Sequence, residues 1–344
     1  MTLRAGIVGC GRVASEFDKE PNSKVVSTHA GAYFAIDGVE LVAACDLNRE
    51  KLELCGKKWG ISSLYQDYRQ MLAKEALDIL SICTWNSTHL EITREAVDGG
   101  VKAIFCEKPI ADSLRNADEM IELCNNKGVI LQINHQRRFD IFHQKTRDYL
   151  RNGNLGRIQQ VTFYYTAGVA NTGSHLFDLL RFYFGDVEWV EGIYSYNSSP
   201  NPSDPNVDGW LHFENGLVAV IQACDVSDYT IFEISILGTL GRLRITSGGF
   251  EAQFEAVGES TRFAGYKELL PAGPPIDPNR PNDAMLRGVE HLIECLRGSK
   301  KSLSSGEDGR QSLEIICALR ESADTDGRRI YLPLEDSTIT IQSR

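Results

Sequence analysis

Short apolar runs alternate with longer amphipathic stretches over the first 133 residues. The apolar runs have the length of β-strands and lie at 4–8, 39–45, 77–83, 101–106 and 129–133. Stretches with helical periodicity lie between them at 48–59, 89–98 and 113–125. Near-continuous apolar strands that alternate with helices are typical of a parallel sheet covered on both faces. The pattern therefore predicts a doubly wound α/β domain with a mostly parallel sheet.

After about residue 150 the strands follow one another at hairpin spacing. They are predicted at 157–166, 187–196, 209–213, 217–223, 229–237 and 241–246, and Asn215-Gly216 is a strong hairpin signal between two of them. The proline-rich stretches 199–208 and 271–282 are predicted to be loops, because proline does not fit central strands. Helical periodicity returns at 284–297 and 306–324, and 329–332 is a candidate last strand. The second half is expected to be an α+β domain with a large, mostly antiparallel open sheet.

The length of 344 residues suits two domains, since one domain usually holds roughly 100 to 200 residues. The boundary is placed near residue 125, so that residues 1–125 form the first domain and 126–344 the second. In this division the C-terminal segment can pack back on the first domain.

Composition narrows the function classes. No run approaches the roughly 20 apolar residues of a membrane span, and the first residues lack the features of a secretion signal. The nine cysteines include no C-x-x-C pair, and the histidines show no metal-ligand spacing. The net charge of −11 is spread along the chain, which opposes binding to phosphate backbones. We expect a soluble cytoplasmic protein without disulfides, bound metal, membrane or nucleic-acid partner.

The first strand leads into a glycine-rich turn, Gly9-Cys10-Gly11-Arg12-Val13-Ala14, that opens a helix. In a dinucleotide site the first glycine of G-x-G-x-x-A makes the tight turn and the second lets the backbone approach a pyrophosphate. Asp46 ends the second strand, where a carboxylate accepts both ribose hydroxyls of NAD and repels the 2′-phosphate of NADP. The spacing to Asp46 exceeds the usual roughly 20 residues, and an insertion at 15–28 accounts for the excess. An ordinary loop and an exposed strand-end carboxylate are the alternatives.

Two further polar groups follow predicted strands, Thr84-Trp85-Asn86-Ser87-Thr88-His89 and Glu107-Lys108-Pro109. Both lie where an open parallel sheet presents its carboxyl edge, which is where ligands bind in this architecture. A lysine beside a reacting carbon can hydrogen-bond a hydroxyl and stabilise charge on its oxygen. The alternative for Lys108 is a solvated surface lysine.

The second domain carries a histidine in the segment Asn171-Thr172-Gly173-Ser174-His175-Leu176-Phe177-Asp178. Gly173 suggests that a helix begins just after it, which places His175 near its start. A histidine is a suitable general acid/base because its reference pKa of about 6.5 lies near working pH. A capping or packing role is the alternative.

Taken together, these motifs resemble the glucose-fructose oxidoreductase, inositol dehydrogenase and rhizopine-catabolism (Gfo/Idh/MocA) family. The resemblance rests on G-C-G-R-V-A, T-W-N-S-T-H, E-K-P, N-H-Q-R-R-F, N-T-G-S-H-L-F-D and S-G-E-D-G, and covers nearly the whole chain. It implies a Rossmann domain that binds NAD, with NADP also possible, and a second domain for substrate binding and oligomerisation. The implied activity is hydride transfer between nicotinamide and a secondary alcohol of a sugar, sugar acid, nucleotide sugar or cyclitol, in a homodimer or homotetramer.

The resemblance also implies roles for individual residues. The cofactor residues would be Gly9, Gly11, Arg12, Val13, Asp46, Thr84, Asn86, His89, Glu107 and Lys108. Lys108, His175 and Asn171 would be catalytic, with His175 as the base, and Gln136 and Arg137 would face the substrate. Asn171 stands where many relatives have aspartate, and an amide cannot stabilise an imidazolium by charge.

Two other functions remain open at this stage. Some relatives keep NAD bound and hydrolyse a glycoside through transient oxidation, with no net redox change. A cofactor-binding regulator without catalysis is a third reading, which the retention of Lys108 and His175 disfavours.

Overall fold

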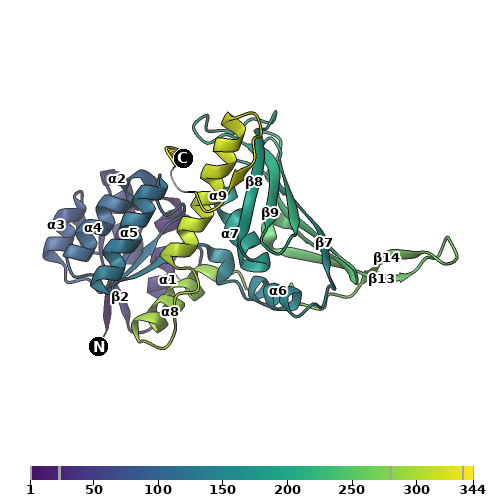
Figure 1. Cartoon of the computed structure of the whole chain (residues 1–344). Coiled ribbons are helices and arrows are strands. Elements are labelled where there is room, and N and C mark those ends of the chain that lie inside the picture. Colours follow the sequence, from purple (N-terminus) through teal and green to yellow (C-terminus); the bar gives the residue numbers. More distant parts are fainter. Residues whose placement is uncertain (1, 22–24, 279–280, 335–336, 344) are drawn as a thin grey trace. The chain divides into compact units, whose positions relative to one another are not determined.

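A computed structural model describes residues 2–21, 25–278, 281–334 and 337–343. The chain it describes divides into two compact units, each built from two separate stretches of sequence (Figure 1). Unit 1 comprises Met1–Asp140 and Pro281–Gln311, and unit 2 comprises Ile141–Arg280 and Ser312–Arg344. Each unit is described by itself.

Unit 1 is built on a parallel sheet. Its strands are β1 (Leu3–Val8), β2 (Val39–Cys45), β3 (Ser63–Tyr65), β4 (Ile79–Ile82), β5 (Ala103–Cys106) and β6 (Ile130–Ile133). Within the described residues these six strands pair in the order β3-β2-β1-β4-β5-β6, and every pair is parallel. The order reverses direction between β1 and β4, the switch point at which such sheets bind ligands. The predicted doubly wound α/β domain is confirmed.

The helices of unit 1 include two that are bounded by a side-chain cap and a left-handed glycine. The helices are α1 (His29–Ala35), α2 (Arg49–Trp59), α3 (Tyr68–Lys74), α4 (His89–Asp98), α5 (Leu114–Lys127) and α8 (Ala284–Leu296). Asn48 caps α2 by accepting a hydrogen bond from the Lys51 amide at 3.1 Å, and Gly60 ends it in the left-handed conformation. Ser113 and Gly128 start and end α5 in the same way. The short elements β3 and α3 had not been predicted.

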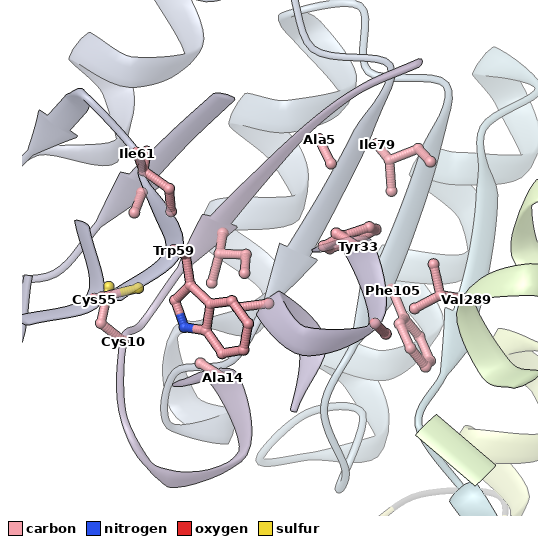
Figure 2. Packing of buried hydrophobic residues seen from close by; sticks show 14 of the residues in the cluster. Ala5, Cys10, Ala14, Tyr33, Cys55, Trp59, Ile61, Ile79, Phe105 and Val289 are labelled. Carbon is pink, nitrogen blue, oxygen red and sulfur yellow. The ribbon is translucent and has the colours of Figure 1, made fainter. Parts of the chain in front are cut away.

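The core of unit 1 joins both of its sequence stretches. Figure 2 shows Tyr33 of α1 and Phe105 of β5 packed in one buried cluster with Val289 of α8. Burying each such side chain stabilises the fold by roughly 1.5–3 kcal/mol. Unit 1 therefore extends past the boundary predicted at residue 125, because β6 pairs with β5 and α8 completes the core.

Unit 2 is built on a second, larger sheet. Its strands are β7 (Ile158–Tyr165), β8 (Val187–Tyr194), β9 (Val207–Phe213), β10 (Val218–Ala223), β11 (Phe232–Gly238), β12 (Gly241–Thr246), β13 (Glu251–Glu259), β14 (Lys267–Ala272) and β15 (Ile330–Tyr331). Across the described residues they pair in the order β14-β13-β12-β11-β7-β10-β9-β8-β15, and only β7 and β10 run parallel. The predicted α+β domain with a mostly antiparallel sheet is confirmed.

One face of this sheet is covered and the other is open. Buried and less buried residues alternate along β9 and β11, as expected for a sheet with one covered face. The helices of unit 2 are α6 (Ile141–Arg151), α7 (Gly173–Phe184) and most of α9 (Gly306–Asp324), whose first turns belong to unit 1. Large apolar side chains remain exposed, among them Tyr164, Ile193 and Trp210.

The proline-rich stretches correct two sequence predictions. Val207 and Asp208, predicted to lie in a loop, begin β9. Pro271, predicted to open a loop, lies in β14, which is an edge strand and therefore tolerates a missing amide donor. Strands β13 and β14 had not been predicted, and in Figure 1 they extend as a hairpin beyond the other strands of their sheet.

Two whole-chain features complete the description. Among the described residues, no helix is long and apolar enough to cross a membrane. In this same part of the chain all nine cysteines are free thiols, and seven of them are buried, as expected for small core residues.

Candidate active site

The carboxyl edge of the unit 1 sheet gathers most of the predicted site residues. Asp46 directly follows β2, Thr84 is the second residue after β4, and Glu107 and Lys108 directly follow β5. Since the strands are parallel and in register, their ends meet at this edge.

The glycine turn after β1 is held against the neighbouring strands. The Gly9 amide donates to the Cys45 carbonyl at 2.8 Å, and the Cys10 amide donates to Asp46 Oδ2 at 2.6 Å. Gly9 has a φ of +91°, and a Cβ there would lie 2.7 Å from the Cys83 carbonyl oxygen. Position 9 therefore requires glycine for two independent reasons.

A cavity of about 450 Å³ opens beside this turn. Four predicted cofactor residues line it: Gly9, Gly11, Asp46 and Thr84. Its other walls come from the ends of β2 and β4 and from neighbouring helices: Val8, Cys45, Leu47, Asn48, Lys51, Gln66, Tyr68, Cys83, Trp85, Thr88, Glu91 and Ile92. The wall is mixed, with a carboxylate at one strand end and apolar side chains around it, as small-molecule sites are.

The turn opens a shorter helix than its pattern suggests. Arg12–Glu16 form a single π-helical turn, in which the Glu16 amide donates to the Gly11 carbonyl at 3.3 Å. Arg12 is exposed and Val13 half-buried, with Val13 packed against the core. The excess chain before α1 is anchored by buried Asp18, which accepts the amides of Ser27 and Thr28. This arrangement accounts for the long spacing to Asp46.

Asn86 and His89 are buried and do not line the cavity; their side chains make hydrogen bonds to the backbone instead. The Asn86 amide donates to the Ala111 carbonyl at 3.2 Å. The two ring nitrogens of His89 contact the carbonyls of Ile110, at 3.0 Å, and Thr84, at 3.2 Å. Burial lowers the pKa of His89. Both residues thus tie the segment after β4 to the segment after β5, and their cofactor role stays a prediction.

Glu107 is turned into the core. It is 8% exposed, and its Oε1 lies 3.0 Å from His29 Nε2 and 2.6 Å from Asn134 Nδ2. Burial raises the pKa of Glu107, but the hydrogen bond and charge of His29, the hydrogen bond from Asn134 and the charge of Lys108 outweigh burial and lower it to about 2. The carboxylate is ionised in a buried setting, and its predicted contact with the cofactor stays untested.

Lys108 follows directly and is half-buried. The peptide bond between Lys108 and Pro109 is cis. Because its side chain is half-buried, Lys108 is not the fully solvated surface lysine of the alternative interpretation.

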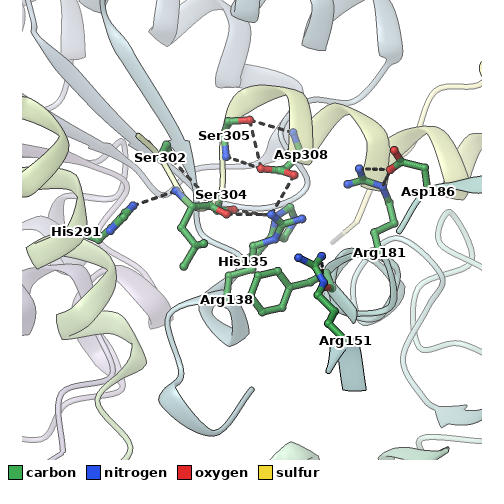
Figure 3. A network of polar contacts seen from close by, with 12 residues as sticks. His135, Arg138, Arg151, Arg181, Asp186, His291, Ser302, Ser304, Ser305 and Asp308 are labelled. Carbon is green, nitrogen blue, oxygen red and sulfur yellow. Dashed lines mark hydrogen bonds and ion pairs between the residues drawn. The ribbon is translucent and has the colours of Figure 1, made fainter. Parts of the chain in front are cut away.

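Gln136 and Arg137 lie in a short 3-10 turn after β6, and both are half-buried. The next residue, Arg138, is buried and pairs with Asp308 at 2.9 Å and with the Leu303 carbonyl at 2.9 Å (Figure 3). Arg138 therefore makes a structural ion pair. Gln136 and Arg137 remain the candidates for substrate contact.

The histidine of unit 2 lies in the first turn of α7, as predicted. His175 is half-buried and its amide donates to the Thr172 carbonyl at 3.1 Å. Asn171 precedes the helix, and its side-chain amide donates to the Ala167 carbonyl at 3.3 Å. The structure brings these two residues to one helix start.

The sequence analysis missed two residues that make hydrogen bonds to predicted site residues. Buried Asp204 accepts the amides of Ala170, at 2.7 Å, and Asn171, at 2.8 Å, and so fixes the turn before α7. His29, which contacts Glu107, is the other. Asp204 lies in the predicted loop 199–208, and this could have indicated its role, because aspartate in a loop commonly accepts hydrogen bonds from backbone amides. His29 carried no local signal beyond the helix start at Thr28.

Comparison with known proteins gives matches over both units. Residues 3–135 match the family model described as "Oxidoreductase family, NAD-binding Rossmann fold". Residues 168–332 match its companion, "Oxidoreductase family, C-terminal alpha/beta domain".

Individual relatives span nearly the full chain. D-apiose dehydrogenase of Paraburkholderia graminis is 28% identical, over 96% of this chain and 90% of that protein. Myo-inositol 2-dehydrogenase of Thermotoga maritima is 24% identical, over 94% of this chain and 96% of that protein. The crystal structure of the WlbA dehydrogenase from Bordetella pertussis, in complex with NADH and UDP-GlcNAcA, is 25% identical with a TM-score of 0.77, over 97% of this chain and all of that one.

Proposed function

Because the chain belongs to the Gfo/Idh/MocA family of NAD-binding oxidoreductases, we propose that it oxidises or reduces a secondary alcohol carbon of a sugar, sugar acid, nucleotide sugar or cyclitol. The observation that carries the proposal is the cavity at the carboxyl edge of the unit 1 sheet, where Gly9, Gly11, Asp46 and Thr84 lie together. Lys108 follows the next strand of the same edge.

The residues at this edge fit a dinucleotide. A Cβ built on Gly11 would meet no described atom within 4 Å, so this glycine faces open space beside the turn. The backbone of residues 9–11 can therefore approach a pyrophosphate, and Asp46 can accept ribose hydroxyls. When bound, NAD supplies the carbon that takes up or returns hydride. The protein has to supply binding, orientation and proton transfer.

Each catalytic candidate has a proton-handling or positioning task. As the alcohol becomes a carbonyl, the carbon loses hydride and the oxygen loses a proton, which His175 accepts. The Lys108 ammonium hydrogen-bonds the same oxygen and stabilises its developing charge. Asn171 orients the substrate or the imidazole by hydrogen bonding, without contributing charge. Gln136 and Arg137 contact the rest of the sugar.

The substrate class follows from the relatives together with the polar side chains. Two of the relatives are named as dehydrogenases of apiose and myo-inositol, and the third was crystallised with UDP-GlcNAcA. Arg137 could pair with a carboxylate or phosphate, which a sugar acid or nucleotide sugar would provide. We place the enzyme in the cytoplasm and expect a homodimer or homotetramer formed through the open face of the unit 2 sheet.

The test begins with cofactor binding and continues with turnover. Thermal-shift titrations with NAD, NADH, NADP and NADPH should show preferential stabilisation by NAD(H). Absorbance of NADH is then followed with a panel of aldoses, cyclitols, sugar acids and nucleotide sugars. Lys108→Ala and His175→Ala should each lower kcat by roughly 10²-fold or more, whereas Lys102→Ala, on an exposed lysine of unit 1, should leave kcat unchanged.

The same assay separates the other two functions. Release of a phenol from chromophoric glycosides without accumulation of NADH would replace the dehydrogenase with a glycosidase. Tight NAD binding with no turnover of any substrate class would indicate a regulator. A complete lack of stabilisation by all four nucleotides would refute the proposal.

A further inference from the structure

A polar network lies inside the apolar core of unit 1. His29 of α1 contacts Ser81 of β4 through Nδ1 at 2.8 Å and Glu107 through Nε2 at 3.0 Å. Asn134, after β6, donates to the same Glu107 oxygen at 2.6 Å, and the Tyr33 hydroxyl reaches Ser81 at 2.8 Å. The network therefore joins α1 to three neighbouring strands of the sheet.

Its members are almost completely withdrawn from water. His29, Ser81 and Asn134 are 0% exposed, Tyr33 1% and Glu107 8%. The ring centroid of His29 lies 4.7 Å from that of Phe105, one of the largest fully buried side chains. A buried carboxylate is tolerated only when hydrogen bonds and opposite charge replace its water. Glu107 Oε1 has two such partners, His29 Nε2 and Asn134 Nδ2, which hold the carboxylate in one arrangement.

Glu107 is buried although its position at a strand end would allow its side chain to reach solvent. It stands at a strand end, where a carboxylate ordinarily turns to solvent, yet His29 and Asn134 hold it inward. Its backbone is fixed as well, because the Glu107 amide donates to the Ile82 carbonyl at 2.9 Å. Main chain and side chain of Glu107 are thus both anchored immediately before Lys108.

We propose that His29 is a positioning residue, which holds Glu107 turned inward and thereby fixes the backbone position from which Lys108 reaches the reacting alcohol. This inference rests on the proposed function, in which Lys108 contacts the substrate. His29 itself lies in the core and touches no reacting atom.

Two conservative variants of His29 separate positioning from packing. In Gln the side-chain amide nitrogen can occupy the region of Nε2 and keep a donor toward Glu107. In Asn the shorter side chain keeps the contact with Ser81 and loses the one with Glu107. Losing a hydrogen bond to a charged group should lower kcat of His29→Asn on the order of tenfold to hundredfold. His29→Gln should recover most of this loss.

A second readout uses the protein without cofactor. After reductive ¹³C-dimethylation of the lysines, the Lys108 NMR signal is assigned by its loss in Lys108→Arg. We expect this signal to move or broaden in His29→Asn and to stay at the wild-type position in His29→Gln. His291→Asn is the matched control, because His291 also lies in unit 1 beside a carboxylate, Glu294 at 3.8 Å, and contacts the backbone of Lys301 and Leu303. It should lose stability but keep kcat and the Lys108 signal.

The outcomes are distinct. Wild-type kcat and an unmoved Lys108 signal in His29→Asn would overturn the positioning role, as would equal losses in the Asn and Gln variants. If His29→Asn does not fold, His29→Leu fills a similar volume and removes the contact with Glu107, and a wild-type kcat with an unmoved Lys108 signal there would overturn the proposal. If the wild type turns over no sugar or polyol, the proposed function fails, and the Lys108 signal still decides whether His29 fixes this segment.

Discussion

Asp46 has a double task at the residue scale. Its two carboxylate oxygens accept the amides of Cys10, at 2.6 Å, and Asn48, at 2.7 Å. The same side chain lines the cavity in which we place the cofactor. One carboxylate thus shapes the glycine turn and offers charge to a ribose.

Replacing Asp46 by asparagine should weaken NAD binding and relax the preference over NADP. The new side-chain NH₂ group would face one of the two backbone amides that Asp46 now accepts, and the neutral side chain would no longer repel a 2′-phosphate. We expect the Kd for NAD to rise about tenfold to hundredfold, with a smaller change for NADP. Fluorescence titration measures both constants. The control is Glu40→Gln, an exposed carboxylate on the same strand, and an unchanged ratio of the two Kd values in Asp46→Asn would contradict the assignment.

Glu107 makes the stability of the protein depend on pH in a defined window. Its pKa of about 2 in the folded protein lies below the ordinary value of 4.5. The ionised carboxylate therefore contributes its stabilisation above about pH 4.5, and this contribution is lost as the pH falls toward 2.

The comparison with Glu107→Gln isolates this effect, since glutamine does not titrate. The difference in unfolding free energy between wild type and variant should be constant above pH 5 and shrink by about 3 kcal/mol as the pH falls to 2. Urea unfolding at several pH values measures it. Parallel curves for the two proteins over that range would show that Glu107 is not held ionised.

The residues that the sequence predicted share one property. Gly9, Asp46, Thr84 and Glu107 each stand at the end of an apolar run, and parallel strands bring such ends to one edge. His29 could not be found in this way, because its partner lies 78 positions away. Its contact depends on how α1 packs on the sheet, which no local pattern records.

At the scale of elements, the turn before α7 depends on a close approach of two loops. Gly168 has a φ of +94°, and a Cβ there would lie 2.2 Å from Asp204 Oδ2 and 2.8 Å from the Asp204 carbonyl oxygen. Asp204 in turn holds the amides of Ala170 and Asn171. The helix start that carries His175 is therefore set by a loop more than thirty residues further along the chain.

Alanine at Gly168 should destabilise the protein by more than the backbone strain alone. Gly185 is a matched control because its φ is +95° and a Cβ there would meet no described atom within 4 Å. We expect Gly185→Ala to cost about 1–3 kcal/mol and Gly168→Ala at least 1 kcal/mol more. Chemical unfolding gives both values. Equal losses of stability would mean that Asp204 can move away from the added methyl group without destabilising the protein.

Elements with strong alternation were predictable, and those without it were not. β9 and β11 show the period of two because one face is covered. β13 and β14 lack it, since Phe254 is the one buried residue in these two strands, and their pairing is decided by backbone hydrogen bonds. Their absence from the sequence prediction follows from this lack of a covered face.

At the scale of the whole molecule, the open face of the unit 2 sheet is the expected contact between copies. Trp210, Ile193 and Tyr164 are 46%, 51% and 37% exposed on neighbouring or nearby strands. Because each is already about half buried, covering its exposed part in an interface would contribute on the order of 1 kcal/mol. A charge placed among them should therefore oppose association.

Trp210→Glu should shift the protein toward monomer. Light scattering coupled to gel filtration measures the mass of wild type and variant at the same concentration. Tyr196→Glu is the control, because Tyr196 is fully exposed and lies outside the strands. A wild-type mass for Trp210→Glu would place the contact on another surface.

The completion of unit 1 by α8 has a consequence for how the protein is made. Met285, Val289, Leu292 and Ile293 close a core whose other members end near residue 105. A ribosome adds about 5–20 residues per second, so the strands of unit 1 wait roughly 10 to 30 s before α8 is synthesised. During that interval unit 2 emerges while the first sheet still exposes the apolar side chains that α8 will cover. The core of unit 1 is therefore completed only after most of unit 2 has been synthesised.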